Sequence, residues 1–272
     1  MNNIERKMVN ILKDLKENHG VGGVKAEFEA EGTRLEEALR LKEVVTKAGL
    51  ELTIKIGGCE AIKDMYDARA IGVNRIVAPM IESPYALKKY LCAADLVFPL
   101  EEIKDVSFLI NIETYQGYKS LDEMLSLKDM KRLSGIVLGR VDMCGSLGLS
   151  REDINTDKIL EIAIDCLTKA KNKNLECVVG GGVAKEALPF LTTLYKKGIL
   201  DRYETRKIIF QADKSLNSKP EEGLLKAVAF ELMWLKNKRE FYGKIFREDD
   251  LRIEMLEKRY IKLIEETGVK IE

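Results

Sequence analysis

Strand-like and helix-like segments alternate along most of this 272-residue chain. The strand-like runs are short and occupy residues 21–31, 51–58, 75–80, 108–113, 136–142, 175–179 and 207–213. Apolar residues at helical spacing fill the intervals between them. This alternation predicts parallel strands joined by right-handed crossovers, which form either a (β/α)8 barrel or a doubly wound open sheet.

The two faces of the strands distinguish these folds. An open sheet covered by helices on both sides needs strands that are apolar on both faces, whereas the helices of a barrel cover only its outside. Here the strands keep one apolar face and turn polar on the other near their C-terminal ends, at Glu27 and Glu29, Thr53 and Lys55, Asn111 and Glu113, Arg140 and Asp142, and Gln211 and Asp213. We therefore predict an α/β fold, a (β/α)8 TIM barrel with these side chains converging at its mouth.

The eighth strand of this barrel is the least clear element. Residues 96–100 are its candidate, and we expect a distorted first or fourth strand on closure. Residues 3–17 predict an N-terminal helix, and about two helices follow Asp213. We divide the chain into a barrel with its N-terminal helix, residues 1–218, and a helical extension, residues 219–272, that packs on the barrel or on a neighbouring subunit.

The composition excludes several classes of partner. Lys and Arg together number 45, as do Asp and Glu, so the charge balance favours neither nucleic acid nor an anionic membrane. No apolar run approaches the roughly 20 residues that span a bilayer, and the N-terminus lacks the hydrophobic centre of a signal peptide, so we expect a cytoplasmic protein. Five scattered cysteines indicate reduced thiols rather than a zinc site.

Two carboxylates mark the candidate site. Glu113 and Asp142 each end a strand-like run, and parallel α/β enzymes hold divalent cations with acids at such strand ends. Two solvated strand-end acids are an equally open interpretation. The only histidine, His19, lies before the first strand, where a surface position is expected, so histidine-dependent triads and histidine-ligated metals are nearly excluded. Oxygen ligands favour Mg²⁺ or Mn²⁺.

Lys55 is the other candidate for chemistry. On the polar face of its strand it could neutralise a substrate carboxylate or a developing enolate oxygen, or it could only pair with Glu27 or Glu29. A Schiff base would need a depressed pKa. Gly180 to Gly182 could cradle an anion through backbone amides, although a tight strand-to-helix turn is the more ordinary interpretation of three glycines.

Three segments together resemble one enzyme family. They are Arg75-Ile-Val-Ala-Pro-Met-Ile-Glu-Ser, Ile110-Asn-Ile-Glu-Thr followed by Ser120-Leu-Asp-Glu-Met-Leu, and Gly135-Ile-Val-Leu-Gly-Arg-Val-Asp-Met-Cys-Gly-Ser-Leu-Gly. These motifs are similar to those of the HpcH/HpaI aldolase and citrate lyase β-subunit family, within the phosphoenolpyruvate/pyruvate barrel superfamily. The resemblance is strongest over residues 24–150.

By this resemblance, Glu113 and Asp142 would be the protein ligands of a magnesium ion that chelates a 2-oxo acid. Backbone amides around Gly139, Arg140 and Val141 would hold the substrate carboxylate. Three departures from the family pattern stand out. Lys55 replaces an arginine that polarises the carbonyl, Arg140 replaces a proline and adds a cation that could bind a second acidic or hydroxylated group, and Ala30 replaces a histidine, which leaves Glu29 or Glu31 as substitutes.

The resemblance implies a Mg²⁺-dependent (or Mn²⁺-dependent) carbon–carbon lyase or aldolase. Such an enzyme joins a pyruvate-like enolate to an aldehyde, sugar-derived aldehydes included, or cleaves the adduct. A citrate-lyase-like enzyme acting on an acyl-CoA thioester, and a barrel that binds a 2-oxo acid or sugar acid without turnover, are the alternatives. Residues 219–266 carry long apolar stripes, which often mark an interface. Members of the resembling family assemble as oligomers, so we expect a homo-oligomer through the C-terminal helices.

Overall fold

The computed structural model describes residues 1–99, 105–128 and 130–268. The chain divides into two compact units, Met1–Glu231 and Leu232–Glu272. The first unit contains a closed barrel whose strands follow one another in chain order. These strands are β1 (Val21–Glu27), β2 (Glu51–Lys55), β3 (Arg75–Ala78), β4 (Ser107–Ile112), β5 (Leu133–Gly139), β6 (Glu176–Gly180), β7 (Arg202–Glu204) and β8 (Ile208–Gln211).

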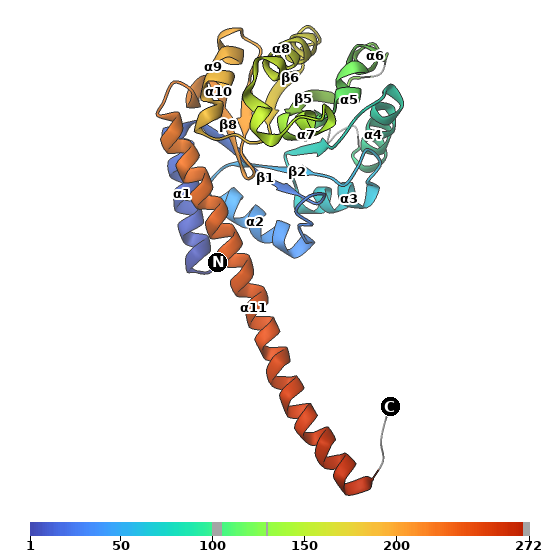
Figure 1. Cartoon of the computed structure of the whole chain (residues 1–272), viewed down its shortest axis with the longest axis vertical. Coiled ribbons are helices and arrows are strands. Elements are labelled where there is room, and N and C mark those ends of the chain that lie inside the picture. The colour runs from blue at the N-terminus through green and yellow to red at the C-terminus, as the bar shows by residue number, and fades with distance from the viewer. Residues whose placement is uncertain (100–104, 129, 269–272) are drawn as a thin grey trace. The chain divides into compact units, whose positions relative to one another are not determined.

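Helices surround this barrel in the first unit (Figure 1). In chain order they are α1 (Asn3–His19), α2 (Leu35–Lys47), α3 (Ile62–Ile71), α4 (Pro84–Val97), α5 (Tyr115–Lys119), α6 (Leu121–Leu125), α7 (Arg140–Ser146), η2 (Arg151–Asn155), α8 (Asp157–Lys171), η3 (Lys185–Ala187), α9 (Leu188–Lys196) and α10 (Ala212–Ser215). The last helix, α11 (Pro220–Thr267), begins in this unit. The predicted barrel with an N-terminal helix is therefore confirmed.

Strand β8 runs against its neighbours. β1 to β7 pair in parallel, whereas β8 is antiparallel to both β7 and β1. A tight hairpin causes the reversal, in which the Thr205 amide donates to the Ile208 carbonyl at 2.9 Å. Our placement of Gln211 and Asp213 at the mouth was therefore wrong. The Gln211 amide instead donates to the Gly20 carbonyl at 2.8 Å, at the opposite end of the barrel.

The eighth strand of the barrel is also not where we predicted it. Leu96 and Val97 belong to α4, and Leu100 lies outside the described residues. The strand that we did not predict is β7. Its hydrophobic pattern does not identify it, because it has only three residues and is charged at both ends. The reversed strand is β8, and the pairing register also shifts in β1, between Val21 and Gly23, and in the β4–β5 pair, between Phe108 and Leu109. The distortion that we expected at the first or fourth strand is therefore present as well.

Capping contacts fix where two of the helices begin. Ser83 caps α4, since its hydroxyl accepts the Ala86 amide and Pro84 is the first helical residue. Helix α2 begins after Arg34, whose backbone amide donates to the Glu37 carboxylate at 3.2 Å.

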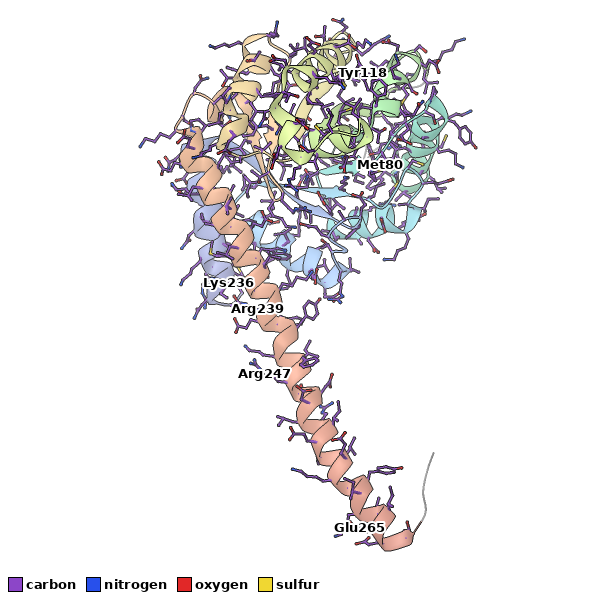
Figure 2. The ribbon with its side chains drawn as sticks, viewed as in Figure 1. Met80, Tyr118, Lys236, Arg239, Arg247 and Glu265 are labelled. Carbon is purple, nitrogen blue, oxygen red and sulfur yellow. The ribbon has the colours of Figure 1, made fainter. Side chains whose placement is uncertain are left out.

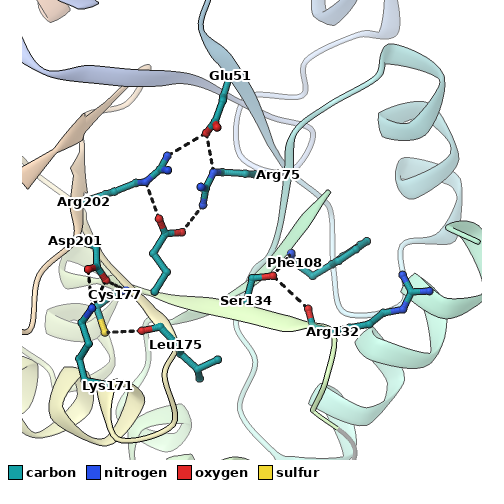
Figure 3. Close-up of polar contacts among 11 residues, drawn as sticks. Glu51, Arg75, Phe108, Arg132, Ser134, Lys171, Leu175, Cys177, Asp201 and Arg202 are labelled. Atoms are coloured by element: carbon teal, nitrogen blue, oxygen red, sulfur yellow. Dashed lines mark hydrogen bonds and ion pairs between the residues drawn. The ribbon is translucent and has the colours of Figure 1, made fainter. Parts of the chain in front are cut away.

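Two layers of side chains fill the lower part of the barrel. Buried valines and a leucine from four adjacent strands form a cluster, Val77, Leu109, Val137 and Val178. Below it, ion pairs join the first residues of four strands, Glu51, Arg75, Glu176 and Arg202 (Figure 3). The barrel is thus closed beneath its C-terminal mouth, which leaves the mouth as the place for a site.

The second unit consists of the distal part of α11 as far as the structure describes it. The helix is continuous over 48 residues, so the prediction of about two helices after Asp213 was wrong. In the first unit, Ala227 and Phe230 of the first turns of α11 are buried. Lys226 contacts His19. We expected His19 at the surface, but it is buried. None of the described helices is both long and apolar enough to cross a membrane.

Candidate active site

Glu113 is a buried acid at the mouth of the barrel. It directly follows β4 and is only 2% exposed. Its Oε1 accepts the Met80 amide at 2.9 Å, and its Oε2 accepts the Asn111 side-chain amide at 2.7 Å. Met80, just after β3, has a φ of 45°, a left-handed conformation that is uncommon for a residue with a side chain. The carboxylate is therefore held in place from two neighbouring strands.

The ammonium group of Lys55 lies between two carboxylates. Lys55 ends β2, and its Nζ lies 3.0 Å from Glu29 Oε2 and 3.5 Å from Glu113 Oε2. Burial lowers the pKa of Lys55, but the attraction of Glu113, then of Glu29 and Glu27, outweighs burial and raises the pKa above 10.5. Lys55 is therefore a cation at neutral pH, which favours an electrostatic role over a Schiff base.

Asp142 lies in the first turn of α7, beside the same mouth. We expected a strand that runs through Asp142, but β5 ends at Gly139 and Arg140 begins a helix. Asp142 is exposed, and its charge contributes to raising the pKa of Glu113, so the two carboxylates interact. Acidic residues in a first helical turn are stabilised by the helix dipole.

Gly139 makes room for Glu113 between the two strands. A Cβ atom built on Gly139 would lie 2.6 Å from Glu113 Cβ and 2.8 Å from Glu113 Oε2. The backbone φ of Gly139 is −91°, which other residues also adopt, so the requirement for glycine is steric. The end of β5 and the buried acid of β4 are therefore packed directly against each other.

The guanidinium of Arg140 binds backbone carbonyls in this structure, whereas the sequence suggested a cation that could bind a second acidic or hydroxylated group of the substrate. Arg140 is fully buried, and its guanidinium donates to the carbonyls of Gly180 and Gly181 and to Asn155 Oδ1, at 3.2, 2.8 and 2.6 Å. Its guanidinium carbon also lies 4.8 Å from the centre of the Phe190 ring. Burial lowers the pKa of Arg140 to about 10. In this position Arg140 ties the start of α7 to the glycine turn after β6.

More charged residues lie inside the barrel than the sequence indicated. Lys25 Nζ lies 2.5 Å from Glu204 Oε1 and 3.1 Å from Glu27 Oε1, and Lys207 pairs with Glu31. Of these residues, Glu27 was predicted on the polar face of the first strand. Glu204 and Lys207 could not be found, because β7 and its hairpin were not recognised.

The oxygen atoms of Glu113 and Asn111 are suited to bind a cation. Burial raises the pKa of Glu113, and although Lys55, the Asn111 amide and the Met80 amide oppose it, the net shift is upward. The positive charge nearby therefore does not compensate the buried carboxylate fully. Asn111 Oδ1 is also buried and has no hydrogen-bond partner in the described part of the chain. A divalent cation beside Glu113 would compensate this charge deficit.

No group of three or more His, Cys, Asp or Glu side chains that could hold a metal occurs among the described residues. A cation held by Glu113 and Asp142 alone would have two protein ligands and open positions for substrate and water, as is common for Mg²⁺. His19 lies at the end of α1, close to Lys226 and Glu222, and takes no part in this arrangement.

Comparison with known proteins gives one family and one fold. A family model described as HpcH/HpaI aldolase/citrate lyase matches residues 22–184. No curated protein matches the chain. Among solved structures, an HpcH/HpaI aldolase from Desulfitobacterium hafniense DCB-2 has a TM-score of 0.60 at 13% identity, covering 75% of this chain and 83% of that one.

Two further structures share the fold at similar distances. An HpcH/HpaI aldolase/citrate lyase family protein from Burkholderia cenocepacia J2315 has a TM-score of 0.55 at 14% identity, covering 84% of this chain and 99% of that one. The Haloferax volcanii malate synthase in a magnesium/glyoxylate complex has a TM-score of 0.53 at 17% identity, covering 73% of this chain and 65% of that one. At these identities the likeness concerns the fold alone.

Proposed function

The chain belongs to the HpcH/HpaI aldolase/citrate lyase family, and on that premise we propose that it is a metal-dependent carbon–carbon lyase that acts on a 2-oxo acid. The observation that carries the proposal is the arrangement of Glu29, Lys55 and Glu113, a buried carboxylate and a cation side by side at the barrel mouth. The aldol cleavage of a 4-hydroxy-2-oxo acid, giving a pyruvate-like acid and an aldehyde, is the reaction that this arrangement suits.

Glu113 and Asp142 are the residues proposed to hold the cation, Mg²⁺ or Mn²⁺. When bound there, such an ion would act as a Lewis acid and stabilise the enolate of the 2-oxo acid. The Haloferax structure named above contains magnesium with glyoxylate, a 2-oxo acid, which is the same class of ligand. Asn111 and the Met80 amide orient Glu113 for this role.

Lys55 is proposed to stabilise negative charge on the substrate carbonyl oxygen. Its raised pKa keeps it protonated, and its position beside Glu113 directs the ammonium toward the proposed cation site. A charge that is fixed before the reaction stabilises the transition state without reorganisation. Lys55 would therefore contribute most when the oxygen becomes negative.

Glu29 is the proposed base. Its carboxylate pairs with Lys55 and is partly exposed at the mouth, where a substrate hydroxyl could reach it. Glu29 would take the proton of that hydroxyl as the carbon–carbon bond breaks, and the electron pair would remain on the 2-oxo acid fragment. Protonation of that fragment then completes the cleavage.

The start of α7 is the proposed carboxylate-binding element. Gly139 precedes the helix, and the amides of Arg140, Val141 and Asp142 belong to its first turn, where they have no intrahelical acceptor. Such amides, with the helix dipole, bind anions. The buried guanidinium of Arg140 would support this role indirectly, because it anchors the first turn to Gly180 and Gly181.

A substrate panel tests the proposal. Pyruvate release from a series of 4-hydroxy-2-oxo acids, and acetyl-CoA release from a citryl-CoA-type thioester, are measured with Mg²⁺ and with a chelator. We expect cleavage of a 4-hydroxy-2-oxo acid that stops on chelation. Turnover that the chelator leaves unchanged, or turnover of the thioester alone, would contradict the proposal.

Binding of Mn²⁺, followed by electron paramagnetic resonance, tests the cation site independently of turnover. Glu113→Gln and Asp142→Asn should each lose binding. Glu123→Gln, a matched change at an exposed residue of α6, should bind Mn²⁺ like the unaltered protein.

A further inference from the structure

An apolar heptad repeat runs along α11 on an exposed face. From Leu225 to Leu263, in steps of alternately three and four residues, every position is apolar or aromatic except Arg239 and Asp249. Leu235, Ile253 and Leu256 are exposed by 52%, 52% and 54%. A repeat of 3.5 residues is the pattern with which helices associate as coiled coils. The stripe therefore has the form of an interface with another helix.

The two charged positions of the repeat determine which helix fits. Arg239 and Asp249 are exposed, and neither forms an ion pair within the described chain. They cannot pair with each other in one helix, because ten residues separate them by about 15 Å. Arg239 precedes Lys244 by as many residues as Asp249 follows it. Two antiparallel copies centred on Lys244 therefore place Arg239 of each copy opposite Asp249 of the other.

The apolar positions match in the same register. Working outward from Lys244, the facing pairs are Tyr242 with Phe246, Leu235 with Ile253, and Leu232 with Leu256. The pairing continues to the ends of the repeat, where Leu225 faces Leu263. We propose that α11 binds a second copy of this chain as an antiparallel coiled coil centred on Lys244, with two buried Arg239–Asp249 pairs.

A parallel, in-register pair is the main alternative geometry. It would place Arg239 against Arg239 and Asp249 against Asp249 in the core of the interface. Like charges at such positions destabilise association. The antiparallel register converts both repulsive contacts into attractive ones, so the core of the repeat selects this direction.

The residues that flank the core are compatible with the antiparallel register. Lys236 of one copy faces Asp250 of the other, and Glu231 faces Arg259. Lys238 and Arg252 form one like-charged flank, but Arg252 already pairs with Glu248 in its own helix at 2.5 Å. Flanking pairs of this kind contribute little each, so the core pairs dominate.

Charge reversal in the full-length chain tests the direction of pairing. Sedimentation velocity over a concentration series is measured for the unaltered chain, Arg239→Asp, Asp249→Arg and the double reversal. Each single reversal should raise the dissociation constant by at least about tenfold, and the double reversal should restore it. Arg247→Asp, on the same helix but outside the repeat, is the matched control and should leave it unchanged (Figure 2).

A monomeric unaltered chain, or single reversals that leave the dissociation constant unchanged, would overturn the proposal. The double variant Leu235→Cys/Ile253→Cys gives a second measurement. Under mild oxidation we expect an intermolecular disulfide between positions 235 and 253, identified by peptide mapping. A disulfide that joins 235 to 235 would instead establish parallel pairing and refute the register.

Discussion

Replacing Gly139 with alanine should displace Glu113 without straining the backbone. The added Cβ would lie 2.6 Å from Glu113 Cβ, and an ordinary carbon–carbon contact is about 3.5 Å, so the two must separate by roughly 0.9 Å. The hydrogen bonds from Met80 and Asn111, at 2.9 and 2.7 Å, would stretch with this movement. Bonds to a charged acceptor are each worth about 1.5–3 kcal/mol.

A displacement of about 1 Å at a catalytic group can lower the rate about 100-fold, which corresponds to about 2.7 kcal/mol. We therefore expect Gly139→Ala to lose about 100-fold in kcat/KM for 2-oxo acid cleavage and to bind Mn²⁺ more weakly. Gly145→Ala in the adjoining helix is the control, because a Cβ there has open space. Mn²⁺ affinity and activity within twofold of the unaltered protein in Gly139→Ala would refute this account of Glu113.

Three further predictions concern charge. Lys55→Met should lower kcat more than it raises KM, and borohydride with pyruvate should trap no adduct on the unaltered enzyme; a trapped adduct would move the enzyme to Schiff-base chemistry. Burial raises the pKa of Glu113 above 4.5, and protons compete with Mn²⁺ for this carboxylate. On acidification, the Mn²⁺ affinity should therefore begin to fall above pH 4.5. An affinity that begins to fall only at or below pH 4.5 would contradict this prediction. Arg202→Met breaks two ion pairs at the base of the barrel and should lower the free energy of unfolding by about 2–4 kcal/mol in urea titrations. The exposed change Lys185→Met should lower it by no more than about 0.5 kcal/mol.

The barrel could be predicted because the sequence of each longer strand alternates between apolar and polar residues. The alternation of Phe108, Ile110 and Ile112 with Asn111 and Glu113 indicates a strand that is covered on one face only. The reversal of β8 carries no such local signal. The antiparallel direction of β8 depends on the hairpin after the three-residue strand β7. It is favoured only when β8 pairs with both β7 and β1 and so closes the barrel.

The site was predictable to the extent that strand ends determine it. Glu29, Lys55 and Glu113 lie together because the C-terminal ends of parallel strands meet at one face. The left-handed backbone of Met80 and the turn of Arg140 toward Gly180 depend on contacts between segments distant in sequence. Strand periodicity placed Arg140 at the mouth, but helix α7 starts at that residue and changes the direction of its side chain.

The exchange of pyruvate methyl protons for deuterium tests the central claim most directly, because it reports enolisation without an aldehyde partner. Proton magnetic resonance in deuterated water would follow the exchange with Mg²⁺ and with a chelator. Exchange should occur with Mg²⁺ in the unaltered protein and in Glu123→Gln, and should be lost with the chelator and in Glu113→Gln. Equal exchange in Glu113→Gln and the unaltered protein, or exchange that persists under chelation, would contradict a cation-assisted enolate at Glu113.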